Sequence, residues 1–421
     1  MTTVKTKEQK QTMLNTMLTP KQQMVLRQEL FDPNWTLMIN YGAVRAGKTI
    51  VNNHSFLYEL RRVHDRAKAA GVKNPLYILA GVSSKTIWNN ILNPLENDFG
   101  IQIKPDKHNS FKLYGVTIVQ AYTGSIAGLG AIRGMTAWGA YVNEASMANE
   151  EVFVEIRQRC SAPGARVVSD TNPDVPTHWL NAKYIKKAET SEEIVANHFR
   201  LDDNTFLTPK YIKSLKETTP SGMFYDRSIL GLWVSGEGAV YRDFNANTML
   251  RDSITLPVNS TIYCGVDWGY EHKGSIVVLA DDQFGNTYLI EEYTYQHKEI
   301  DFWVDVAKDI QSRYGHDVPM YADTARTEHI ARFIRENINC IYGNKAVLSG
   351  IEEVAKQIKT GHFFVAKNKI MEFLNEVYEY VWDEKTGMPV KQNDDVMDAI
   401  RYAYYTQHHH VAFVTSEKYD F

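Results

Sequence analysis

The sequence predicts an α/β fold in two parts, and three observations carry that prediction. Short apolar runs alternate with helical patterns in the first half, which is typical of a mainly parallel sheet covered by helices on both faces. A glycine-rich turn of the phosphate-loop type lies between the first apolar run and a helical stretch. After a segment rich in small residues, 234–239, strand and helix patterns start again in a different order.

We therefore expect a nucleotide-binding domain over 1–235 and a second α/β domain over 236–421. Within the first, 174–235 is mostly helical in pattern and is expected to form a small lid or linker subdomain. Strands are expected at 36–41, 76–82, 138–144 and 165–170, with helices at 48–68, after Ser84 and at 149–159. In the second domain, strands are expected at 261–267, 275–280, 287–292 and 318–322, with helices at 301–315 and about 394–407.

The composition is that of a soluble, intracellular protein. The chain has 421 residues, of which 44% are apolar and 23% charged, and these values exclude a disordered chain. Its three cysteines are far apart, which argues against a disulfide framework or a cysteine-rich zinc site. The polar start is unlike a signal peptide, and no apolar run approaches the ~18 residues needed to span a bilayer. The net charge of −4 means that any nucleic-acid contact must be local.

The strongest motif matches G-x-x-x-x-G-K-[ST] at every fixed position. In this motif, backbone N–H groups and a helix N-terminus bind phosphate oxygens. Lys48 is expected to reach the β- and γ-phosphates, and the Thr49 hydroxyl to bind Mg²⁺. The eight residues that would bind the nucleotide are Gly42, Ala43, Val44, Arg45, Ala46, Gly47, Lys48 and Thr49.

A second nucleotide motif is expected to be an apolar strand ending in Asp-Glu, and here the strand ends in Asn143 and Glu144. Glu144 is well placed to orient or deprotonate the attacking water. Asn143 stands at the usual aspartate position, and its amide oxygen is a weaker partner for Mg²⁺ than a carboxylate. Either the metal is held mainly through Thr49, the phosphates and water, or hydrolysis is slow.

The role of Arg45 is open, and two further residues, Gln22 and Gln23, are candidates for nucleotide contact. Arg45 is either a solvated cation or an arginine that stabilises charge on the transferring phosphoryl group. Gln22 and Gln23 lie before the first strand, and a glutamine amide can pair with the edge of adenine. Surface glutamines are common, so the sequence leaves open whether these two glutamines contact adenine or are ordinary surface residues.

Carboxylates mark the second half. Asp267 and Asp323 each end a predicted strand, while Asp395 and Asp398 share one face at the start of the last helix. Acids at a helix N-terminus also simply interact well with its dipole, and strand-end aspartates are common in turns. Asp398 borders the core, where a carboxylate needs a metal or a hydrogen-bonding partner. Together these residues could bind one or two Mg²⁺ or Mn²⁺ ions that act on a phosphodiester.

One lysine-rich stretch is a candidate for DNA contact. Residues 354–369 form either a wall of a DNA groove or an ordinary solvated face. Its cations are Lys356, Lys359, Lys367 and Lys369.

Taken together, these residues resemble the large subunit of the tailed-bacteriophage terminase, over essentially the whole chain. The loop with Arg45 inside it is similar to the family's phosphate loop with its in-cis arginine. The segment 19–23 resembles the adenine-reading element, 132–134 the approach to the second nucleotide motif, and 168–173 the coupling motif. The segments 265–269, 321–324 and 395–402 resemble the three nuclease motifs. Asn143 is the main departure from the family's pattern.

The resemblance implies a packaging ATPase joined to an endonuclease of the ribonuclease H-like fold. Such a motor subunit uses ATP with Mg²⁺ to move double-stranded DNA into the procapsid. It cuts concatemeric DNA with Mg²⁺ or Mn²⁺, two ions in all, at Asp267, Asp323 and Asp398, with Asp395 as an auxiliary ligand. The implied partners are DNA, the terminase small subunit, the portal protein and further copies of the chain in a ring. No membrane is involved, and the implied location is the cytoplasm of the infected bacterial host.

Two other classes remain open. One is a DNA helicase or translocase without nuclease activity, which would separate or move strands without metal-dependent cutting. The other is a nonenzymatic ATP-binding assembly protein, for which Asn143 leaves some room.

Overall fold

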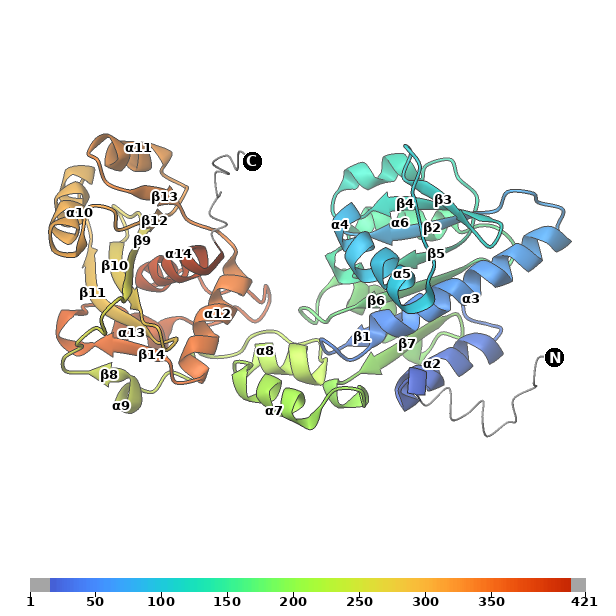
Figure 1. Cartoon of the computed structure of the whole chain (residues 1–421), viewed down its shortest axis with the longest axis horizontal. Coiled ribbons are helices and arrows are strands. Elements are labelled where there is room, and N and C mark those ends of the chain that lie inside the picture. Colours follow the sequence, from blue (N-terminus) through green and yellow to red (C-terminus); the bar gives the residue numbers. More distant parts are fainter. Residues whose placement is uncertain (1–15, 410–421) are drawn as a thin grey trace, which may run out of the picture. The chain divides into compact units, whose positions relative to one another are not determined.

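The computed structural model describes residues 16–409, and this part of the chain forms two compact units (Figure 1). Unit 1 extends to Lys216 and takes in Tyr225–Val234. Unit 2 consists of Glu217–Phe224 and the chain from Ser235 onward. Within 16–409, every helix is too short or too polar to cross a bilayer.

Unit 1 is built on a seven-stranded sheet in the order β3-β4-β2-β5-β6-β1-β7. All neighbouring strands are parallel except the β3–β4 hairpin at one edge. The strands are β1 (Leu37–Gly42), β2 (Leu76–Gly81), β3 (Ser110–Leu113), β4 (Val116–Tyr122), β5 (Ala137–Val142), β6 (Arg166–Thr171) and β7 (Ile194–Phe199).

Helices cover both faces of this sheet, because the central strands are apolar on both sides. Tyr77 and Leu79 pack with the long helix α3, whereas Ile78 and Ala80 pack with α6 on the other face. The helices are α2 (Pro20–Phe31), α3 (Lys48–Ala69), α4 (Ser84–Ile87), the π-helical turn η1 (Trp88–Leu92), α5 (Asn93–Phe99), α6 (Glu150–Arg159) and α7 (Pro209–Thr218).

The predicted α/β class is confirmed, with strands at all the expected positions and others besides. The segment 174–235 was expected to be mostly helical, yet it contains β7, which pairs in parallel with β1. The β3–β4 hairpin was also not expected. Both lie at sheet edges, where alternating exposure produces no continuous apolar run.

Unit 2 has the ribonuclease H-like arrangement, in which a meander of antiparallel strands is extended by parallel ones. Its sheet order is β13-β12-β9-β10-β11-β14-β8. The β9–β10–β11 meander is antiparallel, and β12 adds in parallel to β9. The strands are β8 (Leu250–Arg251), β9 (Thr261–Asp267), β10 (Gly274–Asp281), β11 (Thr287–Tyr295), β12 (Met320–Ala322), β13 (Cys340–Tyr342) and β14 (Phe363–Ala366).

Two helices sandwich the meander. On one face, α10 packs its apolar side, including Trp303 and Ile310, against Val266 and Val278. On the other, α14 lies directly on β9: a Cβ at Gly265 would meet the Ala399 carbonyl oxygen at 1.9 Å. The helices of unit 2 are α8 (Met223–Tyr225), which extends into unit 1, α9 (Ala246–Met249), α10 (Ile300–Tyr314), α11 (Thr327–Arg335), α12 (Val347–Lys359), α13 (Phe373–Glu379) and α14 (Asp395–His409).

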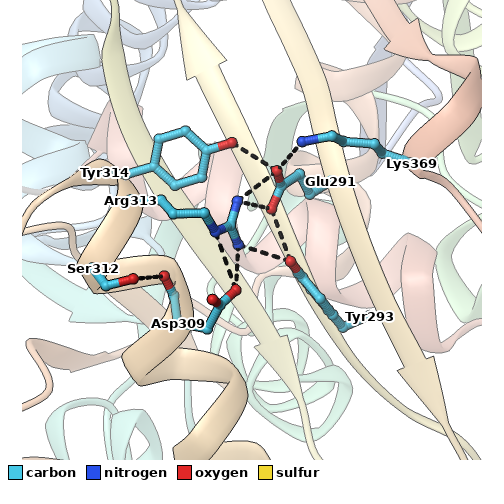
Figure 2. Close-up of polar contacts among 7 residues, drawn as sticks. All are labelled: Glu291, Tyr293, Asp309, Ser312, Arg313, Tyr314 and Lys369. Carbon is cyan, nitrogen blue, oxygen red and sulfur yellow. Dashed lines mark hydrogen bonds and ion pairs between the residues drawn. The ribbon is translucent and has the colours of Figure 1, made fainter.

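A buried carboxylate ties α10 to the sheet. Glu291 on β11 accepts hydrogen bonds from Arg313 Nη1 at 2.6 Å, Tyr314 Oη at 2.8 Å and Lys369 Nζ at 2.5 Å (Figure 2). Burial raises the pKa of Glu291, but these donors together lower it to about 2. The side chain is therefore ionised in the folded protein and fully partnered.

Candidate active sites

The phosphate loop lies between β1 and α3, where the motif requires it. Gly42 has φ 140° and Gly47 has φ 91°, so both glycines are in conformations that other residues rarely adopt. A Cβ at Gly42 would meet the Phe199 carbonyl oxygen at 1.9 Å, so only glycine fits there. Val44 N–H donates to the Ser228 carbonyl at 3.0 Å, which holds the loop against 225–234.

Lys48 is buried and held over this loop. Its Nζ donates to the carbonyl oxygens of Gly42 at 3.0 Å and Ala43 at 2.6 Å, and to Asn172 Oδ1 at 3.0 Å. Burial lowers the pKa of Lys48 to about 8, with Asp170 and Glu144 acting in the opposite direction. The ammonium group lies among acceptors in the position where phosphate oxygens are expected.

The other predicted loop residues are placed as follows. Thr49 is half-buried at the second position of α3, and Arg45 is exposed with φ 60°. Gln22 is buried beside the loop, with its Nε2 donating to the Gly47 carbonyl at 2.8 Å and its Oε1 accepting from Thr19 N–H at 2.8 Å. Gln23 Nε2 donates to the Leu18 carbonyl at 2.9 Å. Adenine contact by either glutamine remains a prediction.

Asn143 and Glu144 follow β5 at the same edge of the sheet as the phosphate loop, which follows the parallel strand β1. The Asn143 amide is fully buried, with its Oδ1 accepting from Asn90 Nδ2 at 2.9 Å and its Nδ2 donating to Asp170 Oδ1 at 2.9 Å. Glu144 is half-buried with φ 54°, and its N–H donates to the same Asp170 oxygen at 3.0 Å. Burial raises the pKa of Glu144, Asp170 raises it further, and Lys48 opposes both. Sequence reasoning missed Asp170 and Asn90 as members of this site.

The segment 168–173 connects these groups. Ser146, two residues after Glu144, donates from its N–H to Thr171 Oγ1 at 2.9 Å and from its hydroxyl to the Asn172 carbonyl at 3.1 Å. Asn172 also accepts from Lys48. The end of β6 and the residue after it thus contact both Lys48 of the phosphate-loop motif and the turn that carries Glu144.

In unit 2, the carboxylates singled out from the sequence line one open pocket of about 760 Å³. Asp267 ends β9, Asp323 follows β12, and Asp395 and Asp398 begin α14. Burial raises the pKa of Asp267 well above its usual range, and Asp398, Asp395 and Asp323 raise it further. The carboxylates therefore lie close enough to repel one another when they are ionised, and cations in the pocket would reduce this repulsion.

Basic side chains occupy parts of this cluster. Lys391 Nζ donates to Asp398 Oδ2 at 2.7 Å, and Arg401 Nη2 is 2.9 Å from Asp398 Oδ1. Lys345 Nζ lies 2.8 Å from Asp323 Oδ1, but not at hydrogen-bonding angles. His272 Nδ1 lies 2.9 Å from Asp395 Oδ1. None of these basic partners was expected from the sequence.

The donors suit a hard divalent cation, which prefers carboxylate oxygens, and Asp323 Oδ1 is buried without a hydrogen-bond donor. As placed, however, no three histidine, cysteine, aspartate or glutamate side chains within 16–409 are close enough to hold an ion together. Metal ligation by Asp267, Asp323 and Asp398 stays a prediction, and it requires the carboxylates to turn from their basic partners.

Most of the lysines proposed for a DNA groove have partners inside unit 2. Lys359 Nζ donates to Ser221 Oγ at 2.8 Å and pairs with Asp243 at 3.1 Å. Lys369 pairs with Glu291, and Lys367 lies 3.8 Å from Asp252. These contacts favour a structural role for the three side chains. Lys356 is exposed.

Three comparisons relate the chain to known proteins. Residues 87–248 match the sequence model of the family "Terminase large subunit, T4likevirus-type, N-terminal". The large terminase of a thermophilic bacteriophage superposes with a TM-score of 0.78 at 25% identity, over 92% of this chain and 98% of that one. A second structure of that phage protein, in complex with ADP, superposes with a TM-score of 0.73 at 25% identity, over 91% and 98%. No curated protein matches the chain.

Proposed function

Because the chain belongs to the family of phage terminase large subunits, we propose that it is an ATP-driven DNA-packaging motor subunit that also cuts DNA. The single observation that carries the proposal is the likeness to a large terminase over nearly the whole length of both chains. The complete phosphate loop in one unit and the acidic pocket in the other agree with it.

For ATP hydrolysis, we assign the charge-neutralising role to Lys48 and Arg45 and the general-base role to Glu144. The raised pKa of Glu144 makes it a stronger base than an exposed glutamate, and the charges of Glu144 and Lys48 affect each other's pKa, which supports a role for both at one site. Thr49 would hold Mg²⁺, which neutralises phosphate charge when bound.

For coupling, contacts lead from the nucleotide site to the last residues of unit 1. His178 Nε2 lies 3.1 Å from the Ser146 carbonyl, and Asp174 pairs with Arg227 at 3.3 Å. Arg227 Nη2 in turn donates to the Val234 carbonyl at 2.7 Å. We propose that loss of the γ-phosphate is sensed at 168–173 and passed along these contacts.

For cutting, we assign Asp267, Asp323 and Asp398 to divalent metal, with Asp395 as an auxiliary ligand. Mg²⁺ or Mn²⁺, two ions in all, would supply Lewis acidity to a phosphodiester. Lys345, Lys391 and His272 line the same pocket, and they are placed to contact a DNA phosphate once the carboxylates bind metal. Cutting is expected to show little sequence preference, because these groups contact phosphate rather than bases.

The partners proposed for this motor are double-stranded DNA, the terminase small subunit, the portal protein and further copies of the chain in a ring. The proposed location is the cytoplasm of the infected host.

The test is ATP hydrolysis by the purified chain with and without double-stranded DNA, beside Mn²⁺-dependent cutting of a plasmid. We expect DNA-stimulated hydrolysis that Glu144→Gln lowers by at least about 100-fold, the lower limit for losing a general base. Hydrolysis without any cutting would favour the translocase alternative. Nucleotide binding without hydrolysis, with Glu144 intact, would favour the assembly protein.

A further inference from the structure

The nucleotide site lacks a carboxylate at position 143, directly after β5, because Asn143 is neutral and both ends of its amide are already bound. We propose that Asp170, at the end of the neighbouring strand β6, supplies the carboxylate that Asn143 lacks. This inference rests on the proposed ATPase function and adds a positioning residue to that site.

The sheet order brings Asp170 to the right place. Strand β6 lies between β5, which is followed by Asn143 and Glu144, and β1, which leads into the phosphate loop. Asp170 is in register with Asn40 of β1, and partners in register on parallel strands point to the same face. Asn40 Nδ2 donates to Asn52 Oδ1 of α3, so this is the face on which α3 and Lys48 lie. Among the acidic groups, Asp170 acts most strongly on the pKa of Lys48.

Asp170 is hydrogen-bonded directly to the backbone of Glu144. Asp170 is 2% exposed, and its Oδ1 accepts from both Asn143 Nδ2 and Glu144 N–H. Glu144 has φ 54°, in the left-handed region that non-glycine residues rarely adopt, and the bond to Asp170 stabilises its backbone there. Oδ2 accepts only a long bond from Tyr141 Oη at 3.3 Å among the described residues, so it keeps capacity for a further donor.

The residues fit Mg²⁺ bound with nucleotide. A buried carboxylate faces the phosphate-loop lysine, and carboxylates outside the ligand set tune metal affinity through hydrogen bonds and charge. Asn90, Asn143 and Asp170 form a continuous hydrogen-bonded row, so the charge on β6 is connected with the position on β5 where an aspartate was expected.

The variant Asp170→Asn removes the charge of this side chain while keeping its size and shape. The amide oxygen can still accept from Asn143 and Glu144, so the variant is expected to fold and to keep the geometry while losing the negative charge. The matched partner is the double variant Asn143→Asp/Asp170→Asn, which returns one carboxylate to the end of β5.

The measurement is ATP-γ-S affinity by calorimetry, in Mg²⁺ and in EDTA, with thermal unfolding as a check on folding. We expect the increase in ATP-γ-S affinity on adding Mg²⁺ to be at least about tenfold smaller for Asp170→Asn than for the wild type. The affinity in EDTA should be unchanged. The double variant should recover most of that loss.

Two results would overturn the inference alone: an Mg²⁺ effect in Asp170→Asn equal to that of the wild type, or equal losses in Mg²⁺ and in EDTA accompanied by a lower Tm. The second result would assign Asp170 a merely structural role. A wild-type chain that binds no ATP-γ-S in either condition would instead overturn the ATPase proposal, and this inference with it.

Discussion

At the scale of single residues, the acidic pocket of unit 2 is held by side chains of opposite charge. Lys391 bridges Asp398 and Asp394, at 2.7 and 3.0 Å, and its pKa is raised because these carboxylates outweigh its burial. A cation that pairs with a metal ligand must be displaced when the metal binds. Lys391 should therefore weaken metal binding while protecting the free site from charge repulsion.

We expect Lys391→Met to bind Mn²⁺ several-fold more tightly than the wild type, by about 1 kcal/mol, which is the order of one partly exposed ion pair. Calorimetric Mn²⁺ titration checks this. Lys385→Met removes an exposed lysine from the same unit and serves as the control. Unchanged or weaker Mn²⁺ binding by Lys391→Met would show that the lysine does not compete with the metal.

At the scale of elements, the docking of α10 depends on a polar cluster as well as on its apolar face. Glu291 is 3% exposed and receives donors from α10, through Arg313 and Tyr314, and from the turn at Lys369 (Figure 2). Removing the charge would weaken the hydrogen bonds that Arg313, Tyr314 and Lys369 make to the buried Glu291 side chain, and breaking a pair with a buried member is costly.

Glu291→Gln should lower the free energy of unfolding by about 2–4 kcal/mol at pH 7. Because the folded pKa of Glu291, about 2, is below the unfolded value, this stability is present above pH ~4.3 and is lost as the pH falls toward 2. Urea unfolding at pH 7 and pH 3 measures both effects, with the exposed Glu384→Gln as control. A constant gap between wild type and Glu291→Gln from pH 7 to pH 3 would contradict the assignment.

The sequence predicted elements better than it predicted the sites. The strands β2 and β5 are nearly continuous apolar runs because helices cover both faces of the sheet, so their pattern can be recognised from the sequence alone. The phosphate loop is likewise local, so its lysine and its glycines could be recognised directly. Asp170 on β6 contacts Asn143 directly after the neighbouring strand β5, and Lys391 contacts Asp398 in the first turn of α14. Such partners depend on the folded arrangement, and no spacing in the chain indicates them.

At the scale of the whole molecule, the two candidate sites lie in separate compact units, each with its own sheet and core. The residues that line the acidic pocket all belong to unit 2, and those around the phosphate loop all belong to unit 1. A defect confined to one site should therefore leave the chemistry of the other in place.

Asp267→Asn should abolish Mn²⁺-dependent cutting of plasmid DNA while leaving ATP hydrolysis within about twofold of the wild type, as expected for independent sites that share no residues. The two assays are run on one preparation, with Glu144→Gln as the reciprocal control. If Asp267→Asn lost both activities while remaining folded by circular dichroism, the sites would not be independent.

The attachment of the phosphate loop to the segment 225–234 has a mechanical consequence. Val44 donates to the Ser228 carbonyl, and a Cβ at Gly231 would meet the Ala43 nitrogen at 2.6 Å, so loop and segment are in close contact. That segment is the last part of unit 1 before the chain enters unit 2 at Ser235. Any shift of the loop is therefore expected to be transmitted to 225–234, and through this segment to the covalent connection that leads into unit 2.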